Sequence, residues 1–172
     1  DQSKILIIGG GAIGLLCALI LEKHKKCKEI ILVEPNEKRL KVCGAHLQSG
    51  TLKPDDKKIQ DNSFDIVFDT VGLETTRNNA IKSVNAGGVI VHIGLTQASG
   101  TFDFRKATLQ EITFIGTYCY TNKDFSNTIE LLSTQKLGKL EWIEYRELSK
   151  GANAFKEIHD GTCAAPKIIL IP

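Results

Sequence analysis

Apolar residues in this chain occur in short, nearly continuous runs, which polar or amphipathic stretches separate from one another. Runs of this kind, rich in β-branched residues, are typical of strands buried in a parallel sheet. They predict strands at residues 4–8, 29–33, 64–69, 89–93, 112–115 and 167–171. The stretches between them predict helices at residues 12–21, 37–44, 74–84, 123–135 and 152–158. Strands that alternate with helices predict the α/β class, with a doubly wound parallel six-stranded sheet and helices on both faces.

Three glycines follow the first predicted strand in the spacing G-x-G-x-x-G: Gly9, Gly11 and Gly14, with Ala12 and Ile13 before the last. The first glycine permits a tight turn, the second lets a pyrophosphate approach the backbone, and the third lets the helix pack against the strand. Backbone N–H groups and the helix dipole then hold the phosphates. The pattern alone is weak, because glycine turns also occur for steric reasons. Its place between a strand and a helix predicts a dinucleotide site.

Glu34 ends the second predicted strand, about 20 residues after Gly14, the distance expected for the acid that accepts hydrogen bonds from the adenosine ribose. The alternative is a solvated acid at the end of a strand. Because a carboxylate repels a 2′-phosphate, Glu34 favours NAD over NADP as the cofactor. Pro35 and Arg39 belong to the same predicted site, and Lys38 and Arg39 would partly offset the repulsion.

The chain has 172 residues, of which 42% are hydrophobic and 24% charged, with a formal net charge of +2. This composition predicts one globular domain and gives no electrostatic reason to expect nucleic acid or a membrane as a partner. The uncharged run at residues 5–21 has a glycine cluster in its middle and no basic leader, which disfavours a membrane span or a signal peptide. The chain contains no Met and begins at Asp1, just before the first strand. We interpret it as a piece cut from a longer protein at a domain junction.

The five cysteines and four histidines are scattered along the chain. No Cys-x-x-Cys pair and no His-Glu-x-x-His cluster occurs, so the sequence predicts free thiols in a reducing cytoplasm and no metal site within this chain. His92 lies inside the predicted strand at residues 89–93. A packed or edge-facing histidine is therefore a better interpretation than a catalytic one, and Cys119 is interpreted as structural.

The chain resembles the cofactor-binding domain of the medium-chain dehydrogenase/reductase family, the zinc-type alcohol dehydrogenases, in four further segments: residues 65–72, 86–95, 115–118 and 165–170. The similarity runs in the family's order from Lys4 to the end of the chain, and the sorbitol and polyol branch is the most similar. The resemblance implies an NAD(P)-binding domain of the Rossmann type at residues 1–145. It also implies a C-terminal return segment, made of a helix and a strand, at residues 146–172.

The resemblance also implies cofactor-binding roles at the ends of the predicted strands. Val71 and Gly72 would lie along the adenosine and its ribose. Ile93, Gly94 and Leu95 would present backbone groups to the nicotinamide. As the alternative, Val71 and Ile93 are simply core residues.

Two more sites follow from the resemblance. Thr117 and Tyr118 would hydrogen-bond the nicotinamide carboxamide through main-chain atoms. As the alternative, Tyr118 and Tyr120 are strand residues with solvated hydroxyls. Lys167 falls where the family often has an Arg that reaches the pyrophosphate, and as a point charge it would bind less specifically.

By this resemblance the full-length protein would be an NAD-dependent alcohol or polyol dehydrogenase, in which zinc polarises the alcohol and hydride passes to the nicotinamide. In the family, the zinc ligands, the proton relay and the substrate pocket come largely from a domain before the first strand. We therefore expect no catalytic residue and no metal ligand in this chain, which would bind NAD without oxidising an alcohol alone. Two weaker alternatives are an NAD-sensing regulatory module and a methyltransferase-type fold that binds S-adenosylmethionine.

One short segment bears on how the chain assembles. Residues 101–104 alternate apolar and polar side chains and predict a short edge strand. Members of the family commonly join such edges across a two-fold axis, so the resemblance implies a homodimer or a tetramer.

Overall fold

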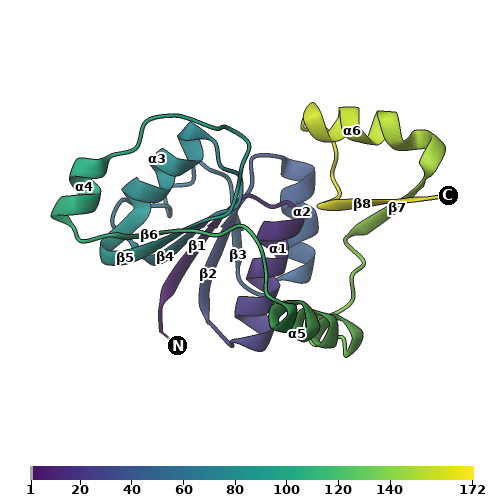
Figure 1. Ribbon diagram of the computed structural model, residues 1–172, viewed down its shortest axis with the longest axis horizontal. Helices are drawn as coiled ribbons and strands as arrows, with labels where there is room; N and C mark the ends of the chain where they lie inside the picture. The colour runs from purple at the N-terminus through teal and green to yellow at the C-terminus, as the bar shows by residue number, and fades with distance from the viewer. Residues whose placement is uncertain (1) are drawn as a thin grey trace.

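A six-stranded parallel sheet forms the centre of the computed structural model, which describes residues 2–172 (Figure 1). Its strands lie in the order β3-β2-β1-β4-β5-β6. Their bounds are β1 Lys4–Ile8, β2 Glu29–Val33, β3 Gly50–Leu52, β4 Phe64–Asp69, β5 Val84–His92 and β6 Thr113–Gly116. Every neighbouring pair is parallel. This order reverses between β1 and β4, so the predicted doubly wound parallel sheet is confirmed.

Helices cover both faces of the sheet, as predicted (Figure 1). Their bounds are α1 Ala12–Leu19, α2 Glu37–His46, α3 Glu74–Ser83, α4 Phe104–Leu109 and α5 Asn122–Ser133. Because side chains alternate along a strand, Ile5 and Ile7 of β1 join the core with α1, α2 and α5. Leu6 and Ile8 join the second core with α3 and α4. The sheet is therefore buried on both sides at β1, as its continuous apolar run indicated.

The connection between β3 and β4 contains no helix within residues 53–63, which the structure describes throughout. A parallel crossover of this kind is usually helical. The face of β1 and β2 that lies next to α3 is consequently covered in part by this loop, and a pocket opens there.

A small second sheet follows α5. Strands β7 Ile143–Glu147 and β8 Lys167–Ile171 pair in parallel, and the 3₁₀ turn η2 Leu148–Lys150 and helix α6 Gly151–His159 connect them. Figure 1 shows this unit, in yellow and light green, beside α2. The return segment was expected to contribute one helix and one strand, and β7 is an addition. The predicted boundary after residue 145 falls inside β7, and the division into two domains stays a prediction.

Three local expectations were wrong. Residues 101–104 form no strand, because Asp103 caps α4, which begins at Phe104, and its carboxylate accepts a hydrogen bond of 2.8 Å from the Lys106 backbone. The predicted helix at residues 12–21 ends as an α-helix at Leu19 and continues as a π-helix, η1 Ile20–His24. The strand predicted at residues 89–93 begins earlier, because β5 starts at Val84, and its register with β4 shifts between Phe64 and Ile66.

In the described part of the chain, none of the helices combines the length and the apolar character that a membrane span requires.

Candidate functional site

The glycine turn lies between β1 and α1, and two of its glycines are required by the packing of this chain. Gly9 has φ of +108°, and a Cβ on it would lie 2.6 Å from Cγ2 of Val71. A Cβ on Gly14 would lie 1.9 Å from the carbonyl oxygen of Gly9. Both positions are therefore closed to any side chain, which confirms the tight turn and the close contact between helix and strand.

Gly11 differs from these two glycines, because a Cβ on it would meet nothing within 4 Å. Its φ of −72° and ψ of −175° are open to any residue. Gly11 is the N-cap of α1, and no side chain caps that helix. The open space at Gly11 therefore faces uncapped backbone N–H groups at a helix N-terminus, where phosphates bind.

Glu34 follows β2 and is buried, with only 4% of its surface exposed. Its Oε2 accepts a hydrogen bond of 2.8 Å from Gly10 N, and its Oε1 accepts one of 2.9 Å from Asn36 N. The Arg39 guanidinium lies 3.7 Å from Oε1. The interpretation of Glu34 as a solvated acid is therefore wrong. Since each carboxylate oxygen can accept two hydrogen bonds, the side chain keeps capacity for ribose hydroxyls.

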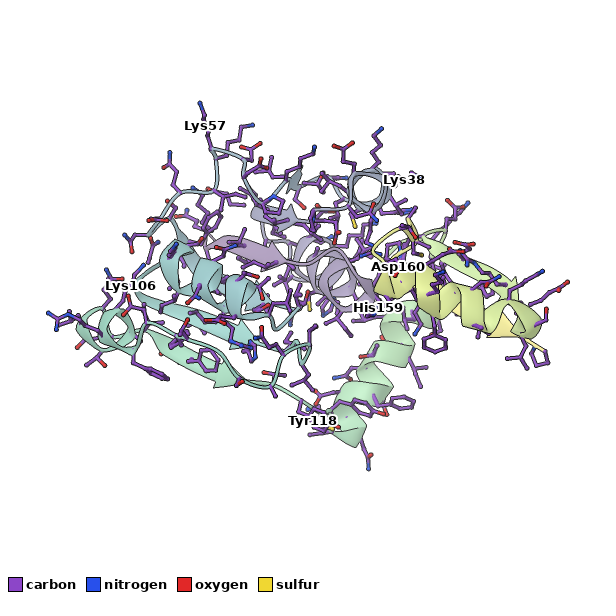
Figure 2. All side chains as sticks on the ribbon, turned by 90° about the horizontal axis from the view of Figure 1, so that it is seen from above. Lys38, Lys57, Lys106, Tyr118, His159 and Asp160 are labelled. Carbon is purple, nitrogen blue, oxygen red and sulfur yellow. The ribbon has the colours of Figure 1, made fainter. Side chains whose placement is uncertain are left out.

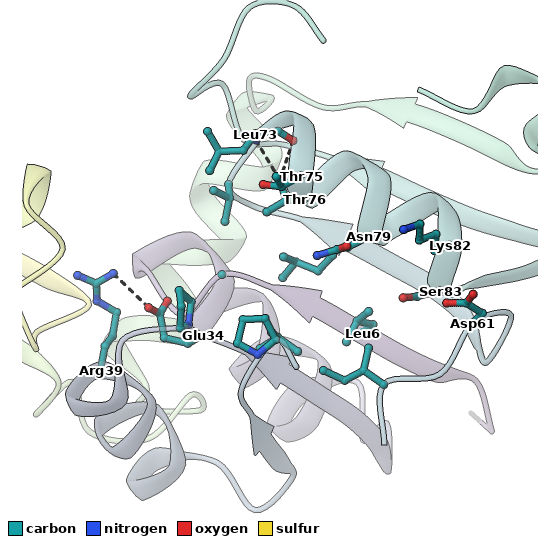
Figure 3. Close-up of a pocket in the computed structure, with 17 residues that line it drawn as sticks. Leu6, Glu34, Arg39, Asp61, Leu73, Thr75, Thr76, Asn79, Lys82 and Ser83 are labelled. Carbon is teal, nitrogen blue, oxygen red and sulfur yellow. Dashed lines mark hydrogen bonds and ion pairs between the residues drawn. The ribbon is translucent and has the colours of Figure 1, made fainter. Parts of the chain in front are cut away.

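A pocket of about 520 Å³ opens beside this acid (Figure 3). The predicted site residues that line it are Gly9, Glu34, Pro35, Arg39 and Val71. Figure 3 shows Glu34 and Arg39 at one end of the pocket and Lys82, Ser83 and Asp61 at the other, with α3 along one side. The alternative that Val71 is only a core residue is incomplete, because its side chain also forms part of the pocket wall.

A second pocket, of about 360 Å³, lies between the glycine turn and the return segment. Gly11, Ala12, Arg39 and Lys167 line it together, so a lysine from β8 is brought to the phosphate side of the glycine turn. Residues far apart in the sequence thus line one pocket, and the role of Lys167 at the pyrophosphate stays a prediction.

Hydrogen bonds hold the return segment against α2. The Asn36 amide donates to the carbonyl oxygens of Gly161, at 2.6 Å, and Cys163, at 3.1 Å. Arg39 also donates to the carbonyl oxygen of Cys163, at 2.8 Å. The Nε atom of Arg39 is buried without a partner among residues 2–172. Arg39 thus contacts both Glu34 and the return segment. The sequence does not predict this link, because it joins positions over 120 residues apart and no local pattern indicates it.

Asp69, at the end of β4, is a further polar residue that sequence reasoning did not select for the site. It is fully buried, its Oδ1 accepts hydrogen bonds from Val71 N and Gly72 N, and its Oδ2 lies 3.1 Å from Nδ1 of His92. The sequence signal that could have found Asp69 is an acidic residue at the end of a predicted buried strand, since acids are rarely buried without a partner. His92 packs against Phe114, with ring centroids 5.5 Å apart, so its interpretation as a packed histidine is confirmed.

Most of the remaining predicted residues lie at the carboxyl ends of β5 and β6. Gly94 and Leu95 line a third pocket, of about 590 Å³, together with His92. Ile93, which precedes them, is half-buried and donates its N–H to the carbonyl oxygen of Asp69 at 2.9 Å. Ile13 lies in the first turn of α1 and is 50% exposed.

Thr117 and the two tyrosines follow β6, which ends at Gly116. The interpretation of Tyr118 and Tyr120 as strand residues is therefore wrong. Tyr118 is 83% exposed on the segment that joins β6 to α5 (Figure 2), and Tyr120 stacks on Phe125. The Thr117 N–H donates to the carbonyl oxygen of His92 at 2.9 Å, so any main-chain bond from Thr117 to a ligand falls to its carbonyl group.

Cys43 packs under the glycine turn, and its Sγ lies 3.4 Å from the carbonyl oxygen of Gly10. Burial, reinforced by the charge of Glu34, raises the pKa of the Cys43 thiol to about 12. Burial also raises the pKa of Cys17 to about 11. Both thiols are therefore protonated near neutral pH. All five cysteines are unpaired, and Cys119 is exposed.

Comparison with known proteins identifies the family of this chain. Residues 12–134 match the family described as zinc-binding dehydrogenase. The chain belongs to this family. It is 29% identical over 168 residues to D-xylulose reductase of Saccharomyces cerevisiae, a match that covers 90% of the chain and 47% of that relative. The chain therefore spans about half the length of the curated relatives it matches.

Two solved structures have the same fold as this zinc-binding dehydrogenase chain. Acetophenone reductase from Geotrichum candidum in complex with NAD has a TM-score of 0.83 at 21% identity, covering 95% of the chain and 47% of that protein. A zinc-binding dehydrogenase from Sinorhizobium meliloti bound to NADP has a TM-score of 0.82 at 20% identity, covering 100% of the chain and 53% of that protein. Membership of the family favours a dehydrogenase over a regulatory module or a methyltransferase-type fold.

Proposed function

We propose that this chain is the NAD-binding part of a zinc-dependent alcohol or polyol dehydrogenase. One observation carries the proposal: Gly11 leaves open space at the uncapped start of α1, directly beside the turn that buried Glu34 braces. A dinucleotide needs both features, because its pyrophosphate approaches the backbone at the glycine and its ribose bonds to the acid.

Different residues at this edge of the sheet bind different parts of the cofactor. The N–H groups that open α1 bind the pyrophosphate, with Lys167 adding charge from the return segment. Glu34 accepts from the ribose, and Pro35 and Val71 line the adenosine pocket. When bound, the nicotinamide ring accepts or donates hydride, which is chemistry that no amino-acid side chain supplies.

The nicotinamide half extends to the other side of the glycine turn. In doubly wound sheets a dinucleotide binds across the carboxyl ends of the strands, where the strand order reverses. If Glu34 holds the adenosine near β2, the nicotinamide would lie over the ends of β4, β5 and β6. Gly72, Ile93, Gly94, Leu95, Thr117 and Tyr118 are at these ends.

NAD is the proposed cofactor in preference to NADP. Glu34 is buried, and its charge would lie close to a 2′-phosphate. Arg39 is only 3.7 Å from the same carboxylate, and its guanidinium softens the discrimination. We therefore expect NADP to bind measurably but more weakly.

The whole protein would act on a small alcohol or polyol, as the names of relatives such as D-xylulose reductase suggest. Among residues 2–172, no group of three or more His, Cys, Asp or Glu side chains could hold a metal ion, so these residues do not fit a catalytic zinc. The metal would be bound by other parts of the protein. The chain alone is expected to bind cofactor without turnover.

Calorimetric titration of the chain with NAD and with NADP tests this function. We expect saturable binding of both, with NAD tighter, and no NADH formation when NAD and a series of alcohols and polyols are added. Absence of NAD binding would refute the cofactor role, and turnover by the chain alone would refute the dependence on a further domain.

The proposal includes a homodimer or tetramer in a cytoplasmic location. β6 is the edge of the large sheet, all four of its residues are exposed, and Phe114 and Ile115 are among them. An exposed apolar edge favours pairing with a second copy. Five unpaired thiols are in keeping with a reducing compartment. Sedimentation equilibrium at high concentration tests the assembly, and a strictly monomeric chain would contradict it.

A further inference from the structure

Asp69 and His92 are direct neighbours at the carboxyl ends of two central strands. They are register partners in the parallel pair of β4 and β5, and Oδ2 of Asp69 lies 3.1 Å from Nδ1 of His92. The Asp69 side chain is 0% exposed, and the His92 side chain is 17% exposed. A buried carboxylate only accepts hydrogen bonds, so Nδ1 of His92 is the donor of this pair.

Asp69 holds the two loops that follow these strands. Its Oδ1 accepts from Val71 N at 3.1 Å and from Gly72 N at 2.9 Å. Its main-chain carbonyl oxygen accepts from Ile93 N at 2.9 Å and from Gly94 N at 3.1 Å. A single residue therefore fixes four backbone N–H groups, two in each loop.

The two loops also touch backbone to backbone. A Cβ on Gly72 would lie 2.0 Å from the carbonyl oxygen of Gly94, and a Cβ on Gly94 would lie 2.1 Å from the carbonyl carbon of Val71. Because no gap separates them, a rotation of the Asp69 carboxylate would displace both loops together.

His92 extends this network to a third loop, the segment that follows β6. Its carbonyl oxygen accepts from Thr117 N at 2.9 Å, and its ring lies against Phe114. The ring lines the pocket formed with Gly94, Leu95 and Phe102, and it is absent from the pocket that contains Glu34. His92 is thus linked to the cofactor-binding loops through Asp69 and through its own backbone, and it is remote from the adenosine pocket around Glu34.

We propose that Asp69 and His92 are a positioning pair, which sets a backbone shelf: residues 93–94 support the nicotinamide half of the cofactor, and residues 71–72 lie between that half and the adenosine pocket that the Val71 side chain lines. This role rests on the proposed NAD-binding function. The Nδ1–H of His92 holds Oδ2 of Asp69 in place, and Oδ1 then holds the amides of Val71 and Gly72. Loss of the histidine bond loosens the shelf and leaves the adenosine side, around Glu34, unchanged.

Two ligands and three variants test the pair. NAD and ADP-ribose share the adenosine, the pyrophosphate and the second ribose, and only NAD carries the nicotinamide ring. His92→Leu and His92→Gln lack a donor at the Nδ1 position, whereas His92→Asn places its amide nitrogen there. Affinities for both ligands are measured by calorimetry, with thermal unfolding as the check on folding and His24→Leu, at the exposed end of η1, as the matched control.

We expect His92→Leu and His92→Gln to bind NAD about fivefold to tenfold more weakly, the range that corresponds to one lost hydrogen bond. Their affinity for ADP-ribose stays at the level of the unaltered chain, and His92→Asn recovers the affinity for NAD. If one of the two donor-free variants fails to fold, the other carries the comparison.

Equal weakening of both ligands would show a general structural role and overturn the proposal. Unchanged NAD affinity in the donor-free variants, or no recovery in His92→Asn, would overturn it as well. If the unaltered chain binds neither ligand, the proposed NAD-binding function is wrong, and the positioning role is overturned with it. Binding of ADP-ribose to every variant keeps these two failures distinguishable.

Discussion

The carboxylate of Glu34 accepts a hydrogen bond of 2.8 Å from the backbone N–H of Gly10, the central glycine of the turn after β1. Its other oxygen accepts from Asn36 N. A Cβ on Gly10 would lie 3.0 Å from Cβ of Glu34 and 3.1 Å from Sγ of Cys43, so the turn is packed against both side chains. The acid expected to bind ribose thus also shapes the turn expected to bind phosphate.

Glu34→Gln should therefore change cofactor preference and stability together. The amide nitrogen of Gln cannot accept, so either Gly10 N or Asn36 N loses its partner, at a cost of about 1–3 kcal/mol in the free energy of unfolding. Loss of the negative charge removes the repulsion of a 2′-phosphate. We expect the ratio of NADP to NAD affinity to rise, as measured by calorimetry of both cofactors.

The exposed Glu37 offers a matched control for this substitution, because it carries the same charge on α2 and pairs with Lys53 at the surface. Glu37→Gln should leave both the cofactor ratio and the stability nearly unchanged, since surface pairs contribute little. A Glu34→Gln chain that keeps its preference for NAD would refute the role of Glu34 in discrimination.

Gly11→Ala and Gly14→Ala should separate cofactor binding from folding. At Gly11 the new methyl group enters space that no residue of the chain fills, and the unfolding free energy should change by no more than about 1 kcal/mol. At Gly14 it would lie 1.9 Å from the Gly9 carbonyl oxygen, an overpacking that costs about 1–3 kcal/mol or more.

Urea unfolding and NAD titration together check this pair of variants. Gly11→Ala is expected to stay folded and to lose most of its NAD affinity, because the methyl group occupies the path of the pyrophosphate. Undiminished binding by Gly11→Ala would show that the phosphates lie elsewhere. Full stability of Gly14→Ala would contradict the close packing of α1 on the turn.

The elements of the large sheet were predictable where burial dominates the sequence. β1, β2 and β4 have the expected bounds, because continuous apolar runs have no alternative in a small protein. β3 has only three residues, Gly50–Leu52, and too little pattern for prediction. At residues 101–104 the alternation indicated a strand, but the cap supplied by Asp103 determined the start of a helix instead.

The candidate site was predictable where one motif contains it. Gly9, Gly11 and Gly14 lie close together in the sequence, and their spacing, together with their place between a strand and a helix, predicts the site. Contacts between distant segments follow from the tertiary fold, so the pairing of Asp69 with His92 and the bond from Arg39 to the Cys163 carbonyl carry no local signal. The alternative that placed Tyr118 in a strand is wrong because the pairing of β6 ends at Gly116.

Asn36→Asp should release the return segment while keeping α2 intact. The Asn36 side-chain oxygen accepts from Lys38 N and Arg39 N as the cap of α2, and a carboxylate keeps this function. The amide nitrogen that donates to Gly161 and Cys163 is lost, and a carboxylate there repels both carbonyl oxygens. Amide hydrogen exchange around residues 160–165 should accelerate, with the thermal midpoint almost unchanged.

Asn36→Ala is the comparison, because it removes the cap as well as the bonds to the return segment. Its stability should fall by about 1 kcal/mol more than that of Asn36→Asp. Equal exchange rates at residues 160–165 in Asn36→Asp and the unaltered chain would show that other contacts hold the return segment.

The cysteines should divide sharply in their reaction with an alkylating reagent at pH 8. Burial raises the pKa of Cys17 to about 11, and burial with the charge of Glu34 raises the pKa of Cys43 to about 12. Thiolate fractions at pH 8 are then about one in a thousand and one in ten thousand, so both should react slowly. Cys119 is exposed and should react first. Mass spectrometry after iodoacetamide treatment reads each site, and in urea all five should react alike. Rapid alkylation of Cys43 in the folded chain would show that the glycine turn opens away from α2, since its Sγ contacts the Gly10 carbonyl oxygen.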